Sequence, residues 1–215
     1  MKVVELFSGI GSQAKALSKI SETKGIKFDV LKTCEWNVHA FVAYNFIHNS
    51  SEVLDHIKNM SKLEVIQALA MHSISFNGIN EIPKKRLTNY SEETLKIIYD
   101  SILKNNNLVD VRKVKGEDIP DDTDLLTYSF PCQDLSNVGS FHGYKHGIDR
   151  DKNTRSGLLW EVERILEEKK SKKFKLPKFL LLENVTALVA QRHNTNFEEW
   201  KQKLKLLLLN ISKKN

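Results

Sequence analysis

The sequence predicts an α/β protein built on an open, mostly parallel β-sheet. Short apolar runs alternate with helix-favouring stretches, as repeated strand–helix–strand units require. Polar or glycine-bearing residues follow directly after most of these apolar runs. Because functional residues in such sheets lie beyond the carboxyl ends of the strands, we expect these residues to meet in one crevice.

The first two strand–helix units are the clearest. An apolar run at residues 3–7 is broken by a glycine-bearing turn and followed by helix-favouring residues 13–20. A second run at 28–34 precedes Asn37, which is expected to cap a helix with apolar residues at helical spacing. These two units predict the first half of a parallel sheet.

The remaining elements are less regular. Residues 50–108 are polar, show no internal repeat and no strong strand, and are interpreted as a helical insertion with helices near 62–71 and 92–103. The run at 179–182 is almost continuously apolar, which is typical of a strand buried on both faces. Further strands are expected at 108–114 and 124–130, and further helices at 154–169 and 197–208.

Composition narrows the class of protein. The chain has 215 residues, of which 40% are hydrophobic and 28% charged, and this excludes collagen-like, mucin-like, coiled-coil and wholly disordered chains. The net charge is +6, and residues 169–215 hold 12 basic residues against 3 acidic ones. A basic end of this kind can attract phosphates, but it is also typical of a solvated tail.

Cysteine usage and hydropathy indicate the compartment. Cys34 and Cys132 lie far apart and form no paired motif, so we expect neither a disulfide framework nor a metal site. The sequence contains no apolar run long enough to cross a membrane and no leader-like N-terminus, so we expect a cytoplasmic protein without membrane contact.

The turn after the first strand is a candidate ligand site. Its residues are Phe7, Ser8, Gly9, Ile10 and Gly11, and the glycines let the backbone approach a ligand at a helix N-terminus. Such turns are common by themselves, but Glu35 follows the second strand, 24 residues beyond Gly11. A carboxylate at that place is the expected acceptor for ribose hydroxyls, and together the two features indicate an adenosine-type ligand.

Cys132 is a candidate nucleophile. It follows Pro131 at the end of a predicted strand and opens a long polar loop, so its thiol can be exposed. An arbitrary cysteine such as Cys34 is more often a small core residue. Glu183 and Asn184 directly follow the apolar run 179–182, and Glu183 is interpreted either as a proton donor or as a cap of the following helix.

These motifs together resemble the DNA (cytosine-5) methyltransferases. The order of the motifs matches that family, and the similarity is greatest to bacterial, mollicute-type members specific for CG. It covers roughly residues 2–205 apart from the insertion. The motifs are Phe-Ser-Gly-Ile-Gly at 7–11, Glu-Trp at 35–36, Asp110, Pro-Cys-Gln at 131–133, Thr-Arg-Ser-Gly-Leu-Leu-Trp at 154–160 and Glu-Asn-Val at 183–185.

The resemblance implies a Rossmann-like, class I S-adenosylmethionine-dependent catalytic domain. S-adenosylmethionine would be wrapped by Phe7, Ser8, Gly9, Ile10 and Gly11, with further contacts from Glu35, Trp36, Asp110, Pro131 and Leu158. Cys132 would attack cytosine C6, Glu183 would protonate N3, Asn184 would fix the base and the cysteine loop, and Arg155 matches an arginine near the active site.

The resemblance also implies a partner. Double-stranded DNA would bind with the target cytosine flipped out, and the loop after Cys132 would contact it through Gln133, Ser136, Lys145 and Arg150. The similarity ends near Lys205, before the last core strands and the target-recognition domain of the family, and 206–215 is a divergent tail. We therefore expect an incomplete catalytic domain at 1–205, which is either a truncated gene product or one subunit of a split enzyme that a C-terminal chain complements. An inactive cofactor-binding remnant and a tRNA cytosine-5 methyltransferase remain open alternatives.

Overall fold

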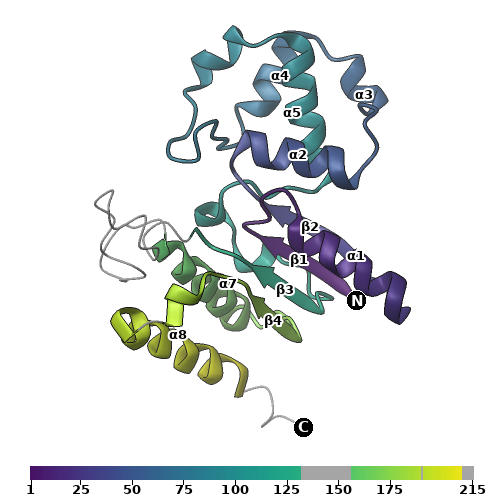
Figure 1. Ribbon diagram of the computed structural model, residues 1–215. Coiled ribbons are helices and arrows are strands. Elements are labelled where there is room, and N and C mark those ends of the chain that lie inside the picture. Colours follow the sequence, from purple (N-terminus) through teal and green to yellow (C-terminus); the bar gives the residue numbers. More distant parts are fainter. Residues whose placement is uncertain (132–155, 190, 210–215) are drawn as a thin grey trace. The chain divides into compact units, whose positions relative to one another are not determined.

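The computed structural model describes residues 1–131, 156–189 and 191–209 (Figure 1). The chain divides into two compact units, Met1–Val111 and Arg112–Asn215. Within each unit helices pack with a pair of parallel strands, so the predicted α/β class with parallel strands is confirmed. Among the described helices, none is long and apolar enough to cross a membrane.

The first unit begins with two strand–helix pairs. β1 and β2 run parallel, with Lys2 opposite Asp29 and Leu6 opposite Cys34 and one irregularity between Val3 and Val4. Both elements that follow these strands are helices, as predicted. The elements of this unit are β1 (Lys2–Leu6), α1 (Ser12–Lys24), β2 (Asp29–Cys34), α2 (Val38–His48), α3 (Asp55–Lys58), α4 (Lys62–Leu69), η1 (Lys84–Asn89) and α5 (Glu92–Lys104).

Local capping explains where α2 begins. The Asn37 side chain accepts hydrogen bonds from the backbone N–H groups of His39 and Ala40, in the first helical turn, where the regular helix pattern supplies no partner. The Ala40 N–H also donates to the Asn37 carbonyl. Asn37 is therefore the N-cap that the sequence predicts. This cap lies two residues after Glu35 and fixes the start of α2 at Val38.

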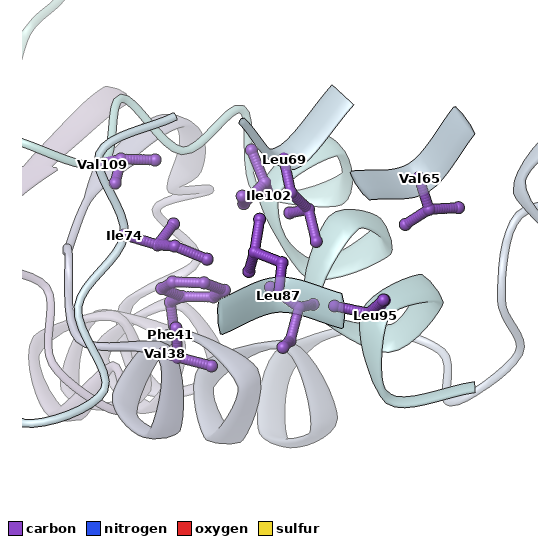
Figure 2. Packing of buried hydrophobic residues seen from close by; sticks show 10 residues of the cluster. Val38, Phe41, Val65, Leu69, Ile74, Leu87, Leu95, Ile102 and Val109 are labelled. Atoms are coloured by element: carbon purple, nitrogen blue, oxygen red, sulfur yellow. The ribbon is translucent and has the colours of Figure 1, made fainter. Parts of the chain in front are cut away.

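The helical segment after α2 shares a hydrophobic core with that helix. Val38 and Phe41 of α2 belong to the same buried cluster as residues of α4 and α5, as Figure 2 shows. The predicted helices near 62–71 and 92–103 are present as α4 and α5. The ten buried members of the cluster are Val38, Phe41, Val65, Leu69, Ile74, Leu87, Leu95, Ile98, Ile102 and Val109.

The strand predicted at 108–114 is absent, and this prediction is wrong. Val109 has a backbone φ of 63°, which an extended strand cannot contain. The segment contacts β2 through the Thr33 backbone, whose N–H donates to the Asn105 carbonyl and whose carbonyl accepts from the Leu108 N–H. Asparagine side chains add to these contacts: Asn106 Nδ2 donates to the Leu31 carbonyl, and the Asn107 amide binds the backbone of Glu35 just after β2. The segment therefore follows β2 as an irregular loop, and η2 (Val111–Lys113) comes next.

The second unit holds a parallel strand pair and two longer helices. Leu125 lies opposite Phe179 and Tyr128 opposite Leu182, in agreement with the predicted strands. In α7 the residues at helical spacing are buried as expected, and in α8 Trp200 packs edge-on against Tyr128. The elements are η3 (Gly116–Asp118), β3 (Leu125–Tyr128), η4 (Ser156–Leu158), α7 (Leu159–Ser171), β4 (Phe179–Leu182), η5 (Thr186–Val189) and α8 (Gln191–Leu209).

The exposure of β4 differs from the prediction. Phe179 and Leu181 are 56% and 45% exposed, so the expectation of a strand buried on both faces is wrong. Their partners across the ladder, Leu125 and Thr127, are buried. Paired residues point to the same face of a sheet. On the face that carries these four side chains, the residues of β3 are therefore buried and those of β4 are exposed, as far as the structure describes the chain.

The buried cluster predicts a large effect of one truncation. Phe41→Ala should lower the free energy of unfolding by about 3–5 kcal/mol, because a 1% exposed ring leaves a cavity among α2, α4 and α5. Urea titration followed by circular dichroism measures this change. Leu63→Ala on α4, at a side chain that is 65% exposed, is the matched control and should change stability by less than about 0.5 kcal/mol. Equal losses in the two variants would contradict the assignment of this core.

Candidate cofactor and catalytic site

The turn that follows β1 has an unusual backbone. Phe7, Gly9 and Gly11 have φ values of 56°, 53° and 84°, all in the left-handed region. For phenylalanine this conformation is strained, and strained backbone of this kind persists where the surrounding structure holds it. The Ser8 N–H donates to the Cys34 carbonyl, which extends the pairing of β1 and β2 into the turn.

Gly11 is required by its neighbours as well as by its φ. A Cβ at this position would lie 2.2 Å from His48 Nε2 and 2.7 Å from Tyr44 Cε2, both on α2. Tyr44 in turn donates a hydrogen bond from its hydroxyl to Glu5 Oε2 at 2.7 Å, within β1. Burial raises the pKa of Glu5, although the bonds from Tyr44 and from the Ala14 N–H oppose this rise. The N-terminus of α1 therefore packs directly against α2.

Glu35 lies at the end of β2 and joins the turn to α2. Its Oε2 accepts from the Gly9 N–H at 3.1 Å, and its Oε1 accepts from the Asn37 N–H at 2.8 Å. Burial raises the pKa of the Glu35 carboxyl, and the N–H groups of Asn37, Gly9 and Trp36 oppose this rise. Each carboxylate oxygen can accept more than one hydrogen bond, so Glu35 can also receive hydroxyl donors from a ligand.

Asn107 is a site residue that the sequence analysis missed. Its Oδ1 accepts from the N–H groups of Glu35 and Val109, both at 3.0 Å, and its Nδ2 donates to the Glu35 carbonyl at 2.9 Å. Asp110, three residues further on, is 4% exposed. The run Asn105-Asn106-Asn107 at the end of a predicted helix was the available signal, but such a run is equally typical of an ordinary helix stop.

The two cysteines differ in environment, as far as the structure describes them. Cys34 is 1% exposed and donates from Sγ to the Val109 carbonyl. Burial raises the pKa of this thiol well above its ordinary value, and the charges of Glu35 and Asp110 raise it further. Cys34 is therefore a neutral core residue, as expected. Cys132 lies outside the described residues.

The second unit places Asn184 against the end of β3. Asn184 Nδ2 donates to the Phe130 carbonyl at 2.8 Å, one residue before Pro131. The Glu183 N–H donates to the Tyr128 carbonyl at 3.1 Å, and the Glu183 side chain is exposed. Asn184 therefore holds the backbone at Phe130, two residues before Cys132.

Not all predicted site residues fall in the described part of the chain. The first unit brings together the turn 7–11, Glu35, Trp36 and Asp110, and the second holds Pro131, Leu158, Glu183 and Asn184. The described residues gather no group of three or more His, Cys, Asp or Glu that could hold a metal ion. Six predicted residues lie outside the described segments: Cys132, Gln133, Ser136, Lys145, Arg150 and Arg155.

Comparison with known proteins identifies the family. The profile of the family described as C-5 cytosine-specific DNA methylase matches residues 67–212, more than half of the chain. The chain belongs to this family. The predicted resemblance is thus confirmed, and Asp110, the Pro-Cys-Gln motif and Glu183 all lie within the matched residues.

Curated relatives extend the similarity beyond the residues that the profile matches. The orphan methyltransferase M.SssI of Spiroplasma monobiae is 39% identical over 210 residues, which are 96% of this chain and 52% of the relative. The type II methyltransferase M2.ScrFI of Lactococcus lactis subsp. cremoris is 32% identical over 93% of this chain and 51% of its own length. The chain thus spans about half the length of these methyltransferases.

The packing around the turn makes Gly11 sensitive to substitution. Gly11→Ala should lower the free energy of unfolding by about 2–4 kcal/mol, because the new methyl group would overlap His48 in addition to the cost of a positive φ. Gly25→Ala is the matched control, since Gly25 has a φ of 67° and open space around it, and it should cost about 1 kcal/mol. Urea unfolding followed by circular dichroism compares the two, and similar losses would show that His48 does not restrict this position.

Proposed function

We propose that the chain carries the cofactor-binding and nucleophile-bearing part of a DNA (cytosine-5) methyltransferase that uses S-adenosylmethionine. The observation that carries the proposal is the bond from Gly9 to Glu35. This bond joins the glycine turn to the Glu35 carboxylate at the carboxyl ends of the parallel strands β1 and β2. Ligand-binding residues in such sheets lie at these ends.

The residues of the first unit suit this cofactor. S-adenosylmethionine offers two ribose hydroxyls, an adenine and an amino-acid end, and it supplies an activated methyl group when bound. Glu35 would accept from the ribose hydroxyls, Trp36 would pack on the adenine, and Asp110 would accept from its amino group. Ser8 Oγ is buried and lacks a hydrogen-bond partner among the described residues, and such an atom favours a polar ligand at the turn. The cofactor contacts of Phe7, Ile10, Gly11, Pro131 and Leu158 remain part of this proposal.

The proposed chemistry begins with Cys132. Cytosine C5 is a poor nucleophile, so a bond from the Cys132 thiolate to C6, with a proton given to N3 by Glu183, would break aromaticity and make C5 nucleophilic. Transfer of the methyl group to C5 would leave S-adenosylhomocysteine. Loss of the C5 proton to a base, cleavage of the C6–Sγ bond and return of the N3 proton to Glu183 would then restore the aromatic ring and the free thiolate. Asn184 would hold the cysteine loop through its bond to Phe130, and Arg155 would act near the same site, as the matching arginine of the family does.

The proposed substrate is double-stranded DNA with the target cytosine flipped out, because neither C6 nor N3 can be reached in this way inside a stacked duplex. Gln133, Ser136, Lys145 and Arg150 would contact the DNA from the loop after Cys132. The restriction-modification type is inferred from the similarity to a type II methyltransferase. The CG target is carried over from the motif resemblance.

The proposed enzyme includes a second polypeptide, which corresponds to the half of the relatives that this chain does not match. The chain spans about half the length of M.SssI and of M2.ScrFI. Phe179 and Leu181 on β4 are exposed although their ladder partners are buried, so this face offers an apolar surface. A complementing C-terminal methyltransferase chain would cover it.

A trapping experiment tests this function. The 215-residue chain, alone and with the C-terminal half of a relative, is incubated with S-adenosylmethionine and a duplex that carries 5-fluorocytosine at CG. Fluorine at C5 blocks the elimination step, so a covalent protein–DNA band should survive denaturing electrophoresis. Cys132→Ala should abolish the band, whereas Cys34→Ala is the matched control and should retain it, because the Cys34 thiol is buried and neutral.

The outcomes of trapping separate the alternatives. A band only in the presence of the second half would establish a split enzyme. Measurable cofactor binding without a band in either mixture would instead favour a cofactor-binding remnant, and a band with tRNA but not DNA would overturn the proposed substrate. A band that persists in Cys132→Ala would exclude the proposed nucleophile.

Cofactor affinity should depend on pH through Glu35. Burial raises the pKa of this carboxyl above its ordinary value of 4.5, and the ionised form accepts hydrogen bonds from the ribose hydroxyls more strongly than the protonated form does. Affinity should therefore fall as the pH decreases through the raised pKa, and it should do so above pH 4.5. Isothermal titration calorimetry with S-adenosylmethionine across pH measures this loss.

Glu35→Gln isolates this titration. The variant should weaken binding by about 1–3 kcal/mol at neutral pH and should flatten the pH profile, because the amide has one acceptor oxygen and no charge to lose. Glu5 also has a raised pKa near the turn and stays in place in this variant. A profile in Glu35→Gln that falls as steeply as that of the native chain would therefore assign the pH dependence to another group.

A further inference from the structure

Asn107 makes a two-sided contact with the backbone of Glu35. Its Oδ1 accepts from the Glu35 N–H at 3.0 Å while its Nδ2 donates to the Glu35 carbonyl at 2.9 Å. The same Oδ1 also accepts from the Val109 N–H. The opposite orientation of the amide would place NH₂ against two N–H donors, so the hydrogen-bond network fixes the assignment of its oxygen and nitrogen. Asn107 is 5% exposed. Its amide binds both the N–H and the C=O of Glu35, as the backbone of a neighbouring strand would.

The residue after Glu35 is held from the same segment of the chain. The Ser75 N–H donates to the Trp36 carbonyl at 2.8 Å, and the Val38 N–H donates to the Ser75 carbonyl at 2.8 Å. Ser75 belongs to the helical segment that was interpreted as an insertion. Both residues of the Glu35–Trp36 pair are therefore fixed through their backbones by residues between 70 and 110.

We propose that Asn107 is a positioning residue that directs the Glu35 carboxylate towards the ribose hydroxyls of the nucleoside cofactor. This inference rests on the proposed function. Asn107 holds both the N–H and the C=O of Glu35. Because the Glu35 side chain extends from this backbone, the direction of its carboxylate depends on the Asn107 amide. Through Val109 the same amide fixes the backbone next to Asp110, which would contact the adenine.

Two ligands separate positioning from simple stability. S-adenosylhomocysteine carries the ribose hydroxyls, and its 2′,3′-dideoxy analogue lacks them. If Asn107 acts by directing Glu35, Asn107→Leu in the 215-residue chain should weaken S-adenosylhomocysteine at least about tenfold and the analogue less than about twofold. Asn107→Asp keeps both acceptor bonds but replaces the Nδ2 donor by a charged oxygen that faces the Glu35 carbonyl, so it should also weaken S-adenosylhomocysteine more than the analogue.

Asn105→Leu is the matched control. Asn105 is also buried, and its side chain binds the Ser101 carbonyl and Asn49 instead of Glu35. This variant should change both affinities by the same factor. Amide hydrogen exchange gives a readout without ligand: the Glu35 N–H should exchange faster in Asn107→Leu, whereas in Asn107→Asp and Asn105→Leu it should remain protected.

Three outcomes would overturn the inference. Equal weakening of both ligands in the Asn107 variants would show that the residue acts on stability alone. An unchanged affinity for S-adenosylhomocysteine in Asn107→Leu or Asn107→Asp would show that Glu35 does not need the clamp. If the native chain bound neither ligand, the proposed function would fail together with this inference, and that result is distinct because it involves no variant.

Discussion

The hydrogen bonds of the Glu35 carboxylate connect the parts of the first unit. One oxygen holds Gly9 in the turn after β1 and the other holds Asn37 at the start of α2. A partly buried carboxylate is costly unless hydrogen bonds compensate for the lost water, and backbone N–H groups provide this compensation here. The turn and α2 are therefore held in place before any ligand arrives, so a nucleoside would meet acceptors that are already oriented.

The helical segment between α2 and residue 108 contributes to this arrangement. It shares a core with α2 through Phe41, and it anchors the backbone of Glu35 through Asn107 and that of Trp36 through Ser75. Loss of this segment would thus expose the core of α2 and also release the Glu35–Trp36 pair. Stability and ligand geometry are coupled in this unit because the same segment determines both.

The sequence predicts most of this unit because its signals are local. The glycine turn, the Asn37 cap and the apolar spacing of α2 each depend on residues within one or two helical turns. The role of Asn107 could not be predicted in the same way, because its partner Glu35 lies 72 residues earlier in the chain. The positive φ of Val109 is equally invisible to local propensity, since β-branched residues favour strands and rarely adopt this conformation.

The exposure of β4 was missed for a different reason. The run Phe179–Leu182 predicts a strand correctly, but burial depends on what covers its faces, and this information is not local. Covering Phe179 and Leu181 would contribute about 2–5 kcal/mol, which alone supports only weak association. A complementing chain would therefore need further contacts, and a strand that pairs with β4 would supply backbone hydrogen bonds together with the apolar cover.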